Sequence, residues 1–436
     1  MKGHESLMRG FLPKFALMFS RWVASLVAPV WYRYPSKNLV VLGVLGSSGK
    51  TSMVNAIHQM LQVGGIRSGL VTSANFKIGN REWTTNKKLG AFGLNKRLKQ
   101  MVKSDCKVAV LAVSSADIFF HRTRGIVFDI LVFANQSSEQ KAYLLKLEQK
   151  LFARLGQSPR KKIAFPTSCL SKKTLVANLD DMNADSFLKF SADQKIGFST
   201  KGAASLFAEE TILAQEITQS REGIDFVVEA GNDRARVHSM LLGVANVHNL
   251  LAAATIGRLS NFSIESIVKA LEGFGGVAGR MERIPSKKGY NVVIDCATTP
   301  DALRLLYSAL RSLYNGKIIA VFGASGERGQ TKRAPMGQIV AGYADYAIIA
   351  NENPYGEDPH EIARDIAEGF KENDKVEGKD FEVIINREHA IEKALLMATG
   401  ENDVVVITGK GSEVGMNIGG KIIPFNDRET VLKYLK

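Results

Sequence analysis

The stretch "VLGVLGSSGKTSMVNAIHQML", residues 41–61, predicts how the first half of this chain folds. An apolar strand runs into a glycine-rich turn, and a helix follows directly. Glycines let backbone N–H groups approach phosphates, and the start of the helix adds partial positive charge. Lys50 would reach the terminal phosphates of a nucleotide, and Thr51 would offer its hydroxyl to Mg²⁺. We predict a phosphate-binding loop that consists of Gly46, Ser47, Ser48, Gly49, Lys50, Thr51 and Ser52. The alternative is a tight glycine turn with an incidental lysine.

The composition sets the class of protein. The chain has 436 residues, of which 45% are hydrophobic and 23% charged, and this length predicts two to three domains. Its cysteines, Cys106, Cys169 and Cys296, lie far apart without a CxxC pair. This spacing predicts neither a zinc site nor a disulfide framework, and it fits the reducing cytoplasm.

The net charge of +14 is the feature that would favour a nucleic-acid partner. The basic residues are spread out, however, and no zinc finger or RNP-like motif accompanies them. Anionic small molecules or an anionic membrane surface explain the excess as well. We therefore predict no nucleic-acid partner.

The segment "FLPKFALMFSRWVASLVAPVWYRYPSK", residues 11–37, is strongly apolar. Arg21 in its middle and Pro29 argue against a bilayer span, and no cleavage pattern suggests a signal peptide. One interpretation is a helix over residues 11–34 that lies in the plane of a membrane, at its inner face. The other is a helix that docks on the domain behind it.

Two alternating sections follow this segment. From residue 38, short apolar strands alternate with amphipathic helices, which predicts an α/β domain with a parallel sheet covered on both faces. A second such section begins near residue 285 and predicts a separate, Rossmann-like doubly wound domain. We expect an N-terminal helix at 1–37, a central domain at 38–281 and a C-terminal domain at 282–436.

Seven further motifs follow the loop: "GVANVHNLLAAA", "GFGGVAGRMERI", "TTPDALRLL", "VFGASGERGQTKRAPMG", "NENPYGEDP", "TGKGSE" and "IPFNDRE". In this order the chain resembles the Mur ligases from about residue 38 to the end, above all those that add the third amino acid to the peptidoglycan precursor. The resemblance implies a P-loop central domain and a C-terminal ligase domain. It also implies ATP and Mg²⁺ as cofactors, and a carboxylate and an amino acid as substrates. ATP would turn the carboxylate into an acyl phosphate, which the amine then attacks.

The resemblance also implies roles for individual residues. Catalysis would fall to Lys50, Glu148 and Arg280. The ATP site would add Asn246, Asn249, Arg280, Lys332 and Arg333 to the loop. The substrates would contact Ser115, Arg122, Asn353, Gly409 and Glu413, and the metal would contact Thr51 and Glu148. Alternatively, Arg122 and Glu413 are ordinary surface charges, and the two asparagines cap a helix.

Several positions depart from the pattern of that family. No counterpart of its uridine-nucleotide domain precedes residue 38. At the end of the strand "VAVLA", Ala112 stands where an acid is expected, and the lysine that the family carbamylates aligns with Glu148. Other expected side chains are replaced at Gln140, Thr298, Tyr355 and Ser412.

These replacements remove most ligands of a second metal ion, and loss of one charge-stabilising group costs about 100- to 1000-fold in rate. The sequence therefore predicts a ligase of cell-wall precursor synthesis that binds ATP and turns over slowly. One alternative is a catalytically silent ATP-binding protein that partners or regulates an active ligase. Another is a polyglutamate-type ligase for a different carboxylate.

Overall fold

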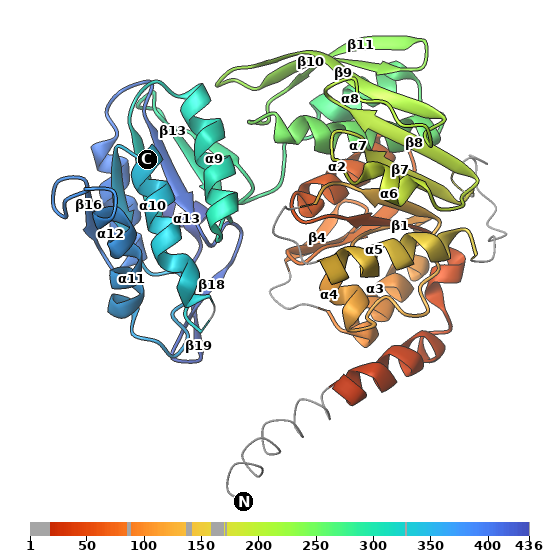
Figure 1. Ribbon diagram of the computed structural model, residues 1–436, viewed down its shortest axis with the longest axis horizontal. Helices are drawn as coiled ribbons and strands as arrows, with labels where there is room; N and C mark the ends of the chain where they lie inside the picture. Colours follow the sequence, from red (N-terminus) through yellow and green to blue (C-terminus); the bar gives the residue numbers. More distant parts are fainter. Residues whose placement is uncertain are drawn as a thin grey trace, which may run out of the picture. The chain divides into compact units, whose positions relative to one another are not determined.

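The computed structural model describes residues 18–84, 89–136, 142–157, 170, 172–327 and 329–435, and they form two compact units (Figure 1). Unit 1 comprises the described residues up to 218 together with Asp225–Ser239 and Ala245–Gly275. Unit 2 comprises Gln219–Ile224, Met240–Val244 and the residues from Gly276 onward. Two short segments near residues 220 and 242 thus belong to the second unit, a detail that the sequence did not predict.

Unit 1 is built on an 11-stranded sheet of order β11-β10-β9-β8-β7-β6-β1-β5-β2-β3-β4. The strands are β1 (Val40–Leu45), β2 (Ser68–Val71), β3 (Asn75–Ile78), β4 (Arg81–Thr84), β5 (Val108–Ala112), β6 (Ile130–Phe133), β7 (Thr174–Asn178), β8 (Gln194–Ser199), β9 (Glu210–Gln219), β10 (Ile224–Ala230) and β11 (Asp233–Ser239). The sheet is parallel from β2 through β5, β1, β6, β7 and β8 to β9, whereas β3 and β4 run antiparallel. Every residue of β1 is buried, as expected for a central parallel strand.

The helices of unit 1 cover both faces of this sheet. They are α2 (Lys50–Val63), α3 (Ala91–Lys103), α4 (Ser115–Phe119), α5 (Ala142–Leu155), α6 (Ala184–Leu188), α7 (Ala245–Leu259) and α8 (Ile264–Glu272). α2, α7 and α8 pack together on one face, and α3, α5 and α6 enclose a core on the other (Figure 1). The glycine loop lies where β1 enters α2.

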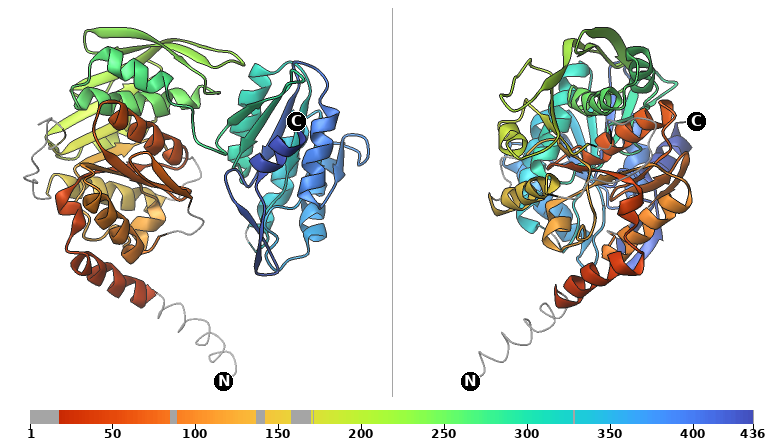
Figure 2. Two further views of the ribbon diagram at one scale, coloured as in Figure 1. Left: turned by 180° about the vertical axis from the view of Figure 1, so that it is seen from behind. Right: turned by 90° about the vertical axis from the view of Figure 1, so that its right-hand side faces the viewer.

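A helix over residues 18–31, followed by the 3₁₀ turn η1 (Pro35–Asn38), precedes β1. Both views in Figure 2 place it at the margin of unit 1, at the opposite end from β9–β11. On the inner side of this helix, its own residues Ser25 and Ala28 are completely buried. The helix therefore docks on the following domain, in line with one of the two interpretations of this segment. Within the described residues, no helix has both the length and the apolarity to cross a bilayer.

Unit 2 contains a six-stranded sheet of order β12-β13-β17-β14-β15-β16, in which β12 alone is antiparallel. Its strands are β12 (Glu282–Pro285), β13 (Asn291–Asp295), β14 (Ile318–Phe322), β15 (Tyr346–Ile349), β16 (Phe381–Val383) and β17 (Val404–Thr408), and β18 (Gly415–Ile418) pairs with β19 (Lys421–Pro424). The helices are α9 (Pro300–Leu313), α10 (Arg333–Tyr343), α11 (Pro359–Lys371), α12 (Arg387–Met397) and α13 (Asp427–Tyr434), with the 3₁₀ turn η3 (Gln330–Lys332) before α10.

Alternate side chains of these strands point into two separate hydrophobic cores, one on each face of the sheet. Val293 faces the core under α9, α10 and α11, and its neighbours Val292 and Ile294 face the core under α12 and α13. The predicted α/β class, with two mainly parallel sheets that helices cover on both faces, is confirmed.

Candidate functional site

The phosphate-binding loop has the backbone that its glycines require. Gly46 has φ +150° and Gly49 has φ +73°, a region that L-residues rarely adopt. A side chain at Gly46 would also lie 3.0 Å from the carbonyl oxygen of Asn135. Gly49 caps α2 without a side-chain hydrogen bond, so the loop and the first turn of α2 form a nest of backbone amides.

Asn135, which follows β6, supports this nest from the neighbouring strand. Ser47 N donates to Asn135 O at 3.0 Å, and Ser48 N donates to Asn135 Oδ1 at 3.1 Å. Lys50 Nζ folds back onto the loop, where it donates to the carbonyls of Gly46 and Ser47. Sequence reasoning missed Asn135. Its signal is its position directly after a buried strand that pairs with β1.

The two asparagines of α7 lie together beside the nest. Asn249 Nδ2 donates to Asn246 Oδ1 at 3.0 Å. A Cβ at Gly49 would lie 3.3 Å from Asn249 Oδ1, so this side chain closes the loop from the side of α7. Asn249 is buried and lies next to Gly49 of the phosphate-binding loop. Its role as a nucleotide ligand stays a prediction.

Between these asparagines, His248 reaches a carboxylate that the sequence did not single out. His248 Nε2 lies 2.8 Å from Asp180 Oδ2, and the hydroxyls of Ser199 and Thr200 donate to Asp180 at 2.5 and 2.6 Å. Burial alone would raise the pKa of Asp180, but these hydrogen bonds lower it to about 2. This ionised carboxylate ties the loops after β7 and β8 to the start of α7.

The end of β5 lacks the expected acid. Ala112 pairs with Val44 at the end of β1, so a methyl group stands beside the entrance to the nest. Three residues on, α4 begins at Ser115, whose hydroxyl donates to Glu148 Oε1 at 2.6 Å. Glu148 is 1% exposed on α5. Two residues predicted for different roles, Ser115 for the substrate and Glu148 for the metal, are thus in direct contact.

Arg122 is held by α4. Its Nη1 lies 2.7 Å from Asp117 Oδ1, and its guanidinium lies 5.5 Å from the centre of the Phe120 ring. Asp117 also completes a capping box with Ser114. A substrate carboxylate would have to share Arg122 with Asp117.

The donors in unit 1 fit one Mg²⁺ ion better than two. Thr51 at the start of α2, with the nest beside it, suits an ion held together with nucleotide phosphates. For a second ion the described part of the chain offers Glu148, Ala112 contributes no donor, and Gln140 lies outside the described residues. No cluster of three or more His, Cys, Asp or Glu side chains suited to a metal occurs among the residues that the structure describes.

In unit 2, Arg280 lies at the start of the domain beside a loop of the "TGKGSE" motif. Its Nη1 donates to Cys296 Sγ, and burial lowers the pKa of its guanidinium. The preceding Gly279 has φ +67°, and a Cβ there would lie 2.2 Å from Ser412 N. This close approach holds Arg280 next to the loop in which Ser412 replaces the expected histidine.

Arg333 is almost fully buried at the start of α10. Its guanidinium pairs with Glu357 at 2.6 Å and with Asp365 at 2.9 Å. Lys332, one residue earlier, is exposed. The structure therefore gives Arg333 a packing role within unit 2. The predicted ATP contacts of both residues stay predictions.

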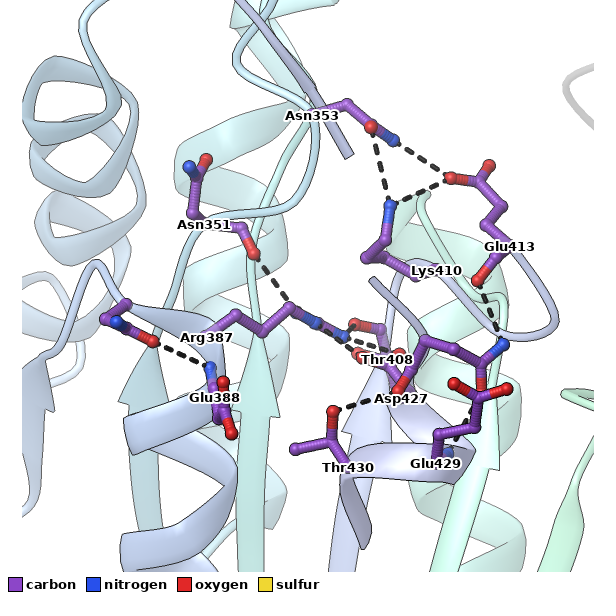
Figure 3. Close-up of polar contacts among 12 residues, drawn as sticks. Asn351, Asn353, Arg387, Glu388, Thr408, Lys410, Glu413, Asp427, Glu429 and Thr430 are labelled. Atoms are coloured by element: carbon purple, nitrogen blue, oxygen red, sulfur yellow. Dashed lines mark hydrogen bonds and ion pairs between the residues drawn. The ribbon is translucent and has the colours of Figure 1, made fainter. Parts of the chain in front are cut away.

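The three residues predicted for the amino-acid pocket come together around Lys410, which the sequence did not single out (Figure 3). Lys410 Nζ lies 3.0 Å from Glu413 Oε2, and Asn353 Nδ2 donates to the same oxygen at 3.1 Å. Gly409 has φ +113°, and a Cβ there would lie 3.2 Å from the side chain of Glu352. Burial raises the pKa of Glu352, whose Oε2 has no hydrogen-bond partner among the described residues.

A completely buried ion pair underlies this pocket (Figure 3). Arg387 at the start of α12 makes two parallel bonds to Asp427 at the start of α13, at 2.8 and 2.9 Å. Arg387 also donates to Thr408 O at 2.8 Å, at the end of β17. The pair thus fixes the strand end from which Gly409 and Lys410 emerge.

Comparison with known proteins gives two domain matches and relatives that match over most of this chain. Residues 44–257 match the Mur ligase middle domain, and residues 279–411 match the Mur ligase glutamate ligase domain. UDP-N-acetylmuramoyl-L-alanyl-D-glutamate–2,6-diaminopimelate ligase of Caldanaerobacter subterraneus is 32% identical over 410 residues, which cover 94% of this chain and 80% of the relative. The corresponding ligase of Halalkalibacterium halodurans is 31% identical over 432 residues, 98% and 84% of the two chains.

Solved structures agree with these matches. A structure of a UDP-N-acetylmuramoyl-L-alanyl-D-glutamate–2,6-diaminopimelate ligase has 27% identity and a TM-score of 0.63, and the match covers 93% of this chain and 80% of that one. A folylpolyglutamate synthase of Mycobacterium tuberculosis, at 15% identity and a TM-score of 0.65 over 89% and 92% of the two chains, shares the fold.

Proposed function

Because this chain belongs to the Mur ligase family, we propose that it is an ATP-dependent acid–amino-acid ligase of peptidoglycan precursor synthesis. The two family domains, and relatives that are named as diaminopimelate-adding ligases, support this class of reaction. The observation that carries the proposal is the amide nest at Gly46–Thr51, which Asn135 and Asn249 hold in shape. We further propose that the chain acts in the cytoplasm, where ATP is available.

Individual residues of this chain would each have a separate role in the reaction. Lys50 would leave the loop carbonyls and neutralise the terminal phosphates, and Thr51 would hold Mg²⁺ at the start of α2. This ion would offset charge on the phosphates while the carboxylate is phosphorylated. Arg280, with its guanidinium buried beside the 409–413 loop, would stabilise the oxyanion that forms when the amine attacks.

The pocket around Lys410 would receive the incoming amino acid. Glu413, whose side chain is half exposed, can accept hydrogen bonds from its ammonium group, while Lys410 and Asn353 hold the Glu413 carboxylate in place. The relatives' diaminopimelate adds a distal charged end. At the position where the family motif has an arginine for that end, this chain has Tyr355. We therefore propose an amino acid other than the one in the relatives' names.

A second candidate function rests on the end of β5. Ala112 contributes no acid at the end of β5, and Glu148, the carboxylate predicted for the metal, already accepts a hydrogen bond from Ser115. The donors do not fit a second metal ion, and no step of the reaction is assigned to one. A chain that binds Mg-ATP in this way but turns it over slowly or not at all would act as a partner or regulator of an active ligase.

An assay of phosphate release from Mg-ATP distinguishes the active ligase from the silent partner. It is run with a panel of muramoyl peptides, folates and amino acids. A ligase releases phosphate only when both a carboxylate and an amino acid are present. The Ala112→Glu variant should raise the rate at least about 10-fold if the missing acid limits turnover, and Ala112→Gln, which has the same size without the charge, should not.

Three outcomes of this assay distinguish the proposed functions. If the wild-type chain binds ATP but is inert, and Ala112→Glu gains turnover, the chain is the silent partner. Turnover that requires a folate would favour the polyglutamate-type reaction. Absence of nucleotide binding by wild type would overturn both proposals.

A further inference from the structure

The helix over residues 18–31 buries its small or polar residues and exposes its large apolar ones, which is the reverse of an ordinary amphipathic helix on a protein surface. The stripe that docks on unit 1 consists of small or polar residues, among them Ser25 and Ala28, both 0% exposed. Its large apolar residues point outward instead, and Phe19 and Val30 are each 58% exposed. A helix that only covered its own domain would bury its large apolar residues, not its serine.

The outward side chains form one continuous surface, which we call the apolar face. It consists of Phe19, Trp22, Val23, Leu26, Val27, Val30 and Trp31, each at least 37% exposed. It continues onto Phe92 of α3, whose ring lies 6.4 Å from that of Tyr32. Contiguous apolar surface of this kind marks an interaction site, whereas single exposed hydrophobic residues do not.

The charged residues of the helix and of the turn that follows it, through Asn38, are all positive. Arg33 and Lys37 are exposed where the helix ends. Between residues 6 and 81 the sequence contains no aspartate or glutamate at all. Tryptophans at both ends of the face, Trp22 and Trp31, suit the boundary between lipid headgroups and acyl chains.

A hollow of about 530 Å³ lies directly beside the helix. Its lining combines the cations Arg124, Lys150 and Arg154 and the imidazole of His121 with apolar side chains such as Ile118 and Leu147. We call it the basic hollow. The Arg124 guanidinium lies 5.6 Å from the ring centre of Trp22, and a Cβ at Gly125 would lie 2.5 Å from Pro29 Cγ. The basic hollow and the apolar face therefore share one edge.

We propose that this combined surface docks the protein onto an anionic lipid bilayer, with the helix in the plane of the membrane. The apolar face enters the headgroup region, and the basic hollow receives lipid phosphates. A symmetric second copy fits less well, because it would bring the same cations face to face. The proposal does not depend on the chain's enzymatic activity.

Flotation with lipid vesicles tests the apolar face. Wild type should float with vesicles of phosphatidylcholine and phosphatidylglycerol, and it should partition at least about 5-fold more weakly onto phosphatidylcholine alone. The double variant Val23→Glu, Val30→Glu should lose at least about 10-fold of this binding. The matched control is Leu305→Glu, Leu396→Glu, which changes two exposed leucines of unit 2 in the same way and should bind as wild type does.

The basic hollow is tested separately. The variant Arg124→Glu, Lys150→Glu should lose the preference for phosphatidylglycerol while it keeps weak binding to neutral vesicles. Its control is Arg364→Glu, Lys379→Glu, two exposed cations of unit 2. Circular dichroism and the thermal midpoint of each variant establish that it is folded.

Either of two results would overturn the proposal. In the first, folded wild type stays out of the anionic vesicle fraction. In the second, light scattering shows that wild type dimerises, while Val23→Glu, Val30→Glu is monomeric and vesicle binding is the same in both. The apolar face would then be an interface between copies. ATP binding and phosphate release can be measured without vesicles, so failure here leaves the proposed function untouched.

Discussion

Lys50 is the residue on which nucleotide binding most depends. Its ammonium rests on the carbonyls of its own loop and is placed to transfer to phosphate. Replacement by alanine should weaken binding of Mg-ATP by at least about 10-fold, because a charge-assisted contact of about 1.5 kcal/mol or more is lost. Calorimetric titration measures this, with Lys96→Ala, an exposed lysine of α3, as the control. Equal affinity in both variants would contradict the assignment of Lys50 to the phosphates.

Asp180 gives a prediction about pH. Hydrogen bonds lower its pKa from 3.8 to about 2, so the folded state favours the ionised form. This stabilisation, on the order of 2 kcal/mol, is fully present above about pH 4 and is lost as the pH falls toward 2. Asp180→Asn should therefore be less stable than wild type at pH 7, and the difference should shrink below pH 4. Urea unfolding at both pH values measures it, and a difference that stays constant with pH would contradict the prediction.

For individual residues, the sequence predicts which of them lie together better than it predicts their hydrogen-bond and ion-pair partners. The motif order brings Asn353, Gly409 and Glu413 into one pocket, and the structure shows them together. Asn135 and Lys410 were missed, because an asparagine after a strand and a lysine in a glycine turn are common in any sequence. Arg333 looks like a ligand in sequence, but the acids that surround it, Glu357 and Asp365, come from a distant part of the chain.

Among the elements, α12 and α13 depend on one buried ion pair. Both side chains of Arg387 and Asp427 are 0% exposed, so removal of one leaves a buried charge without its partner. Arg387→Ala should cost about 3–5 kcal/mol of folding stability. The matched control on the same helix is Lys393→Ala. The Lys393 side chain is 48% exposed, and its pair with Glu382 should contribute less than about 1 kcal/mol. Chemical denaturation distinguishes the two, and similar losses would show that the pair is not critical.

The strands were the most predictable elements. Central strands such as β1, β14 and β17 are continuous runs of buried apolar residues, and their alternation with amphipathic helices leaves the parallel sheet as the simplest fold. The face that the N-terminal helix presents was not predictable. An apolar helix gives no sign in sequence of whether its small or its large residues dock.

For the whole molecule, nucleotide binding and stability are linked. A ligand that binds only the folded chain adds about 2.7 kcal/mol at 100 times its Kd. Saturating Mg-ATP should therefore raise the thermal midpoint by roughly 5 °C. Differential scanning calorimetry measures the shift, and the Lys50→Ala variant should show little of it. A shift that persists in this variant would place the nucleotide elsewhere.

The contact between Glu148 and Ser115 has one more consequence, which concerns a dissolved gas. The resemblance to the Mur ligases implies a lysine at this position that captures carbon dioxide to form a carboxylate, whereas this chain carries a carboxylate in its own sequence, buried on α5. Turnover by wild type should then be the same in degassed buffer and in bicarbonate, and Glu148→Lys should gain rate when bicarbonate is supplied. Such a protein would carry a permanent carboxylate in place of a reversible carbon dioxide adduct. Its reaction rate would then not depend on the carbon dioxide concentration in the cell.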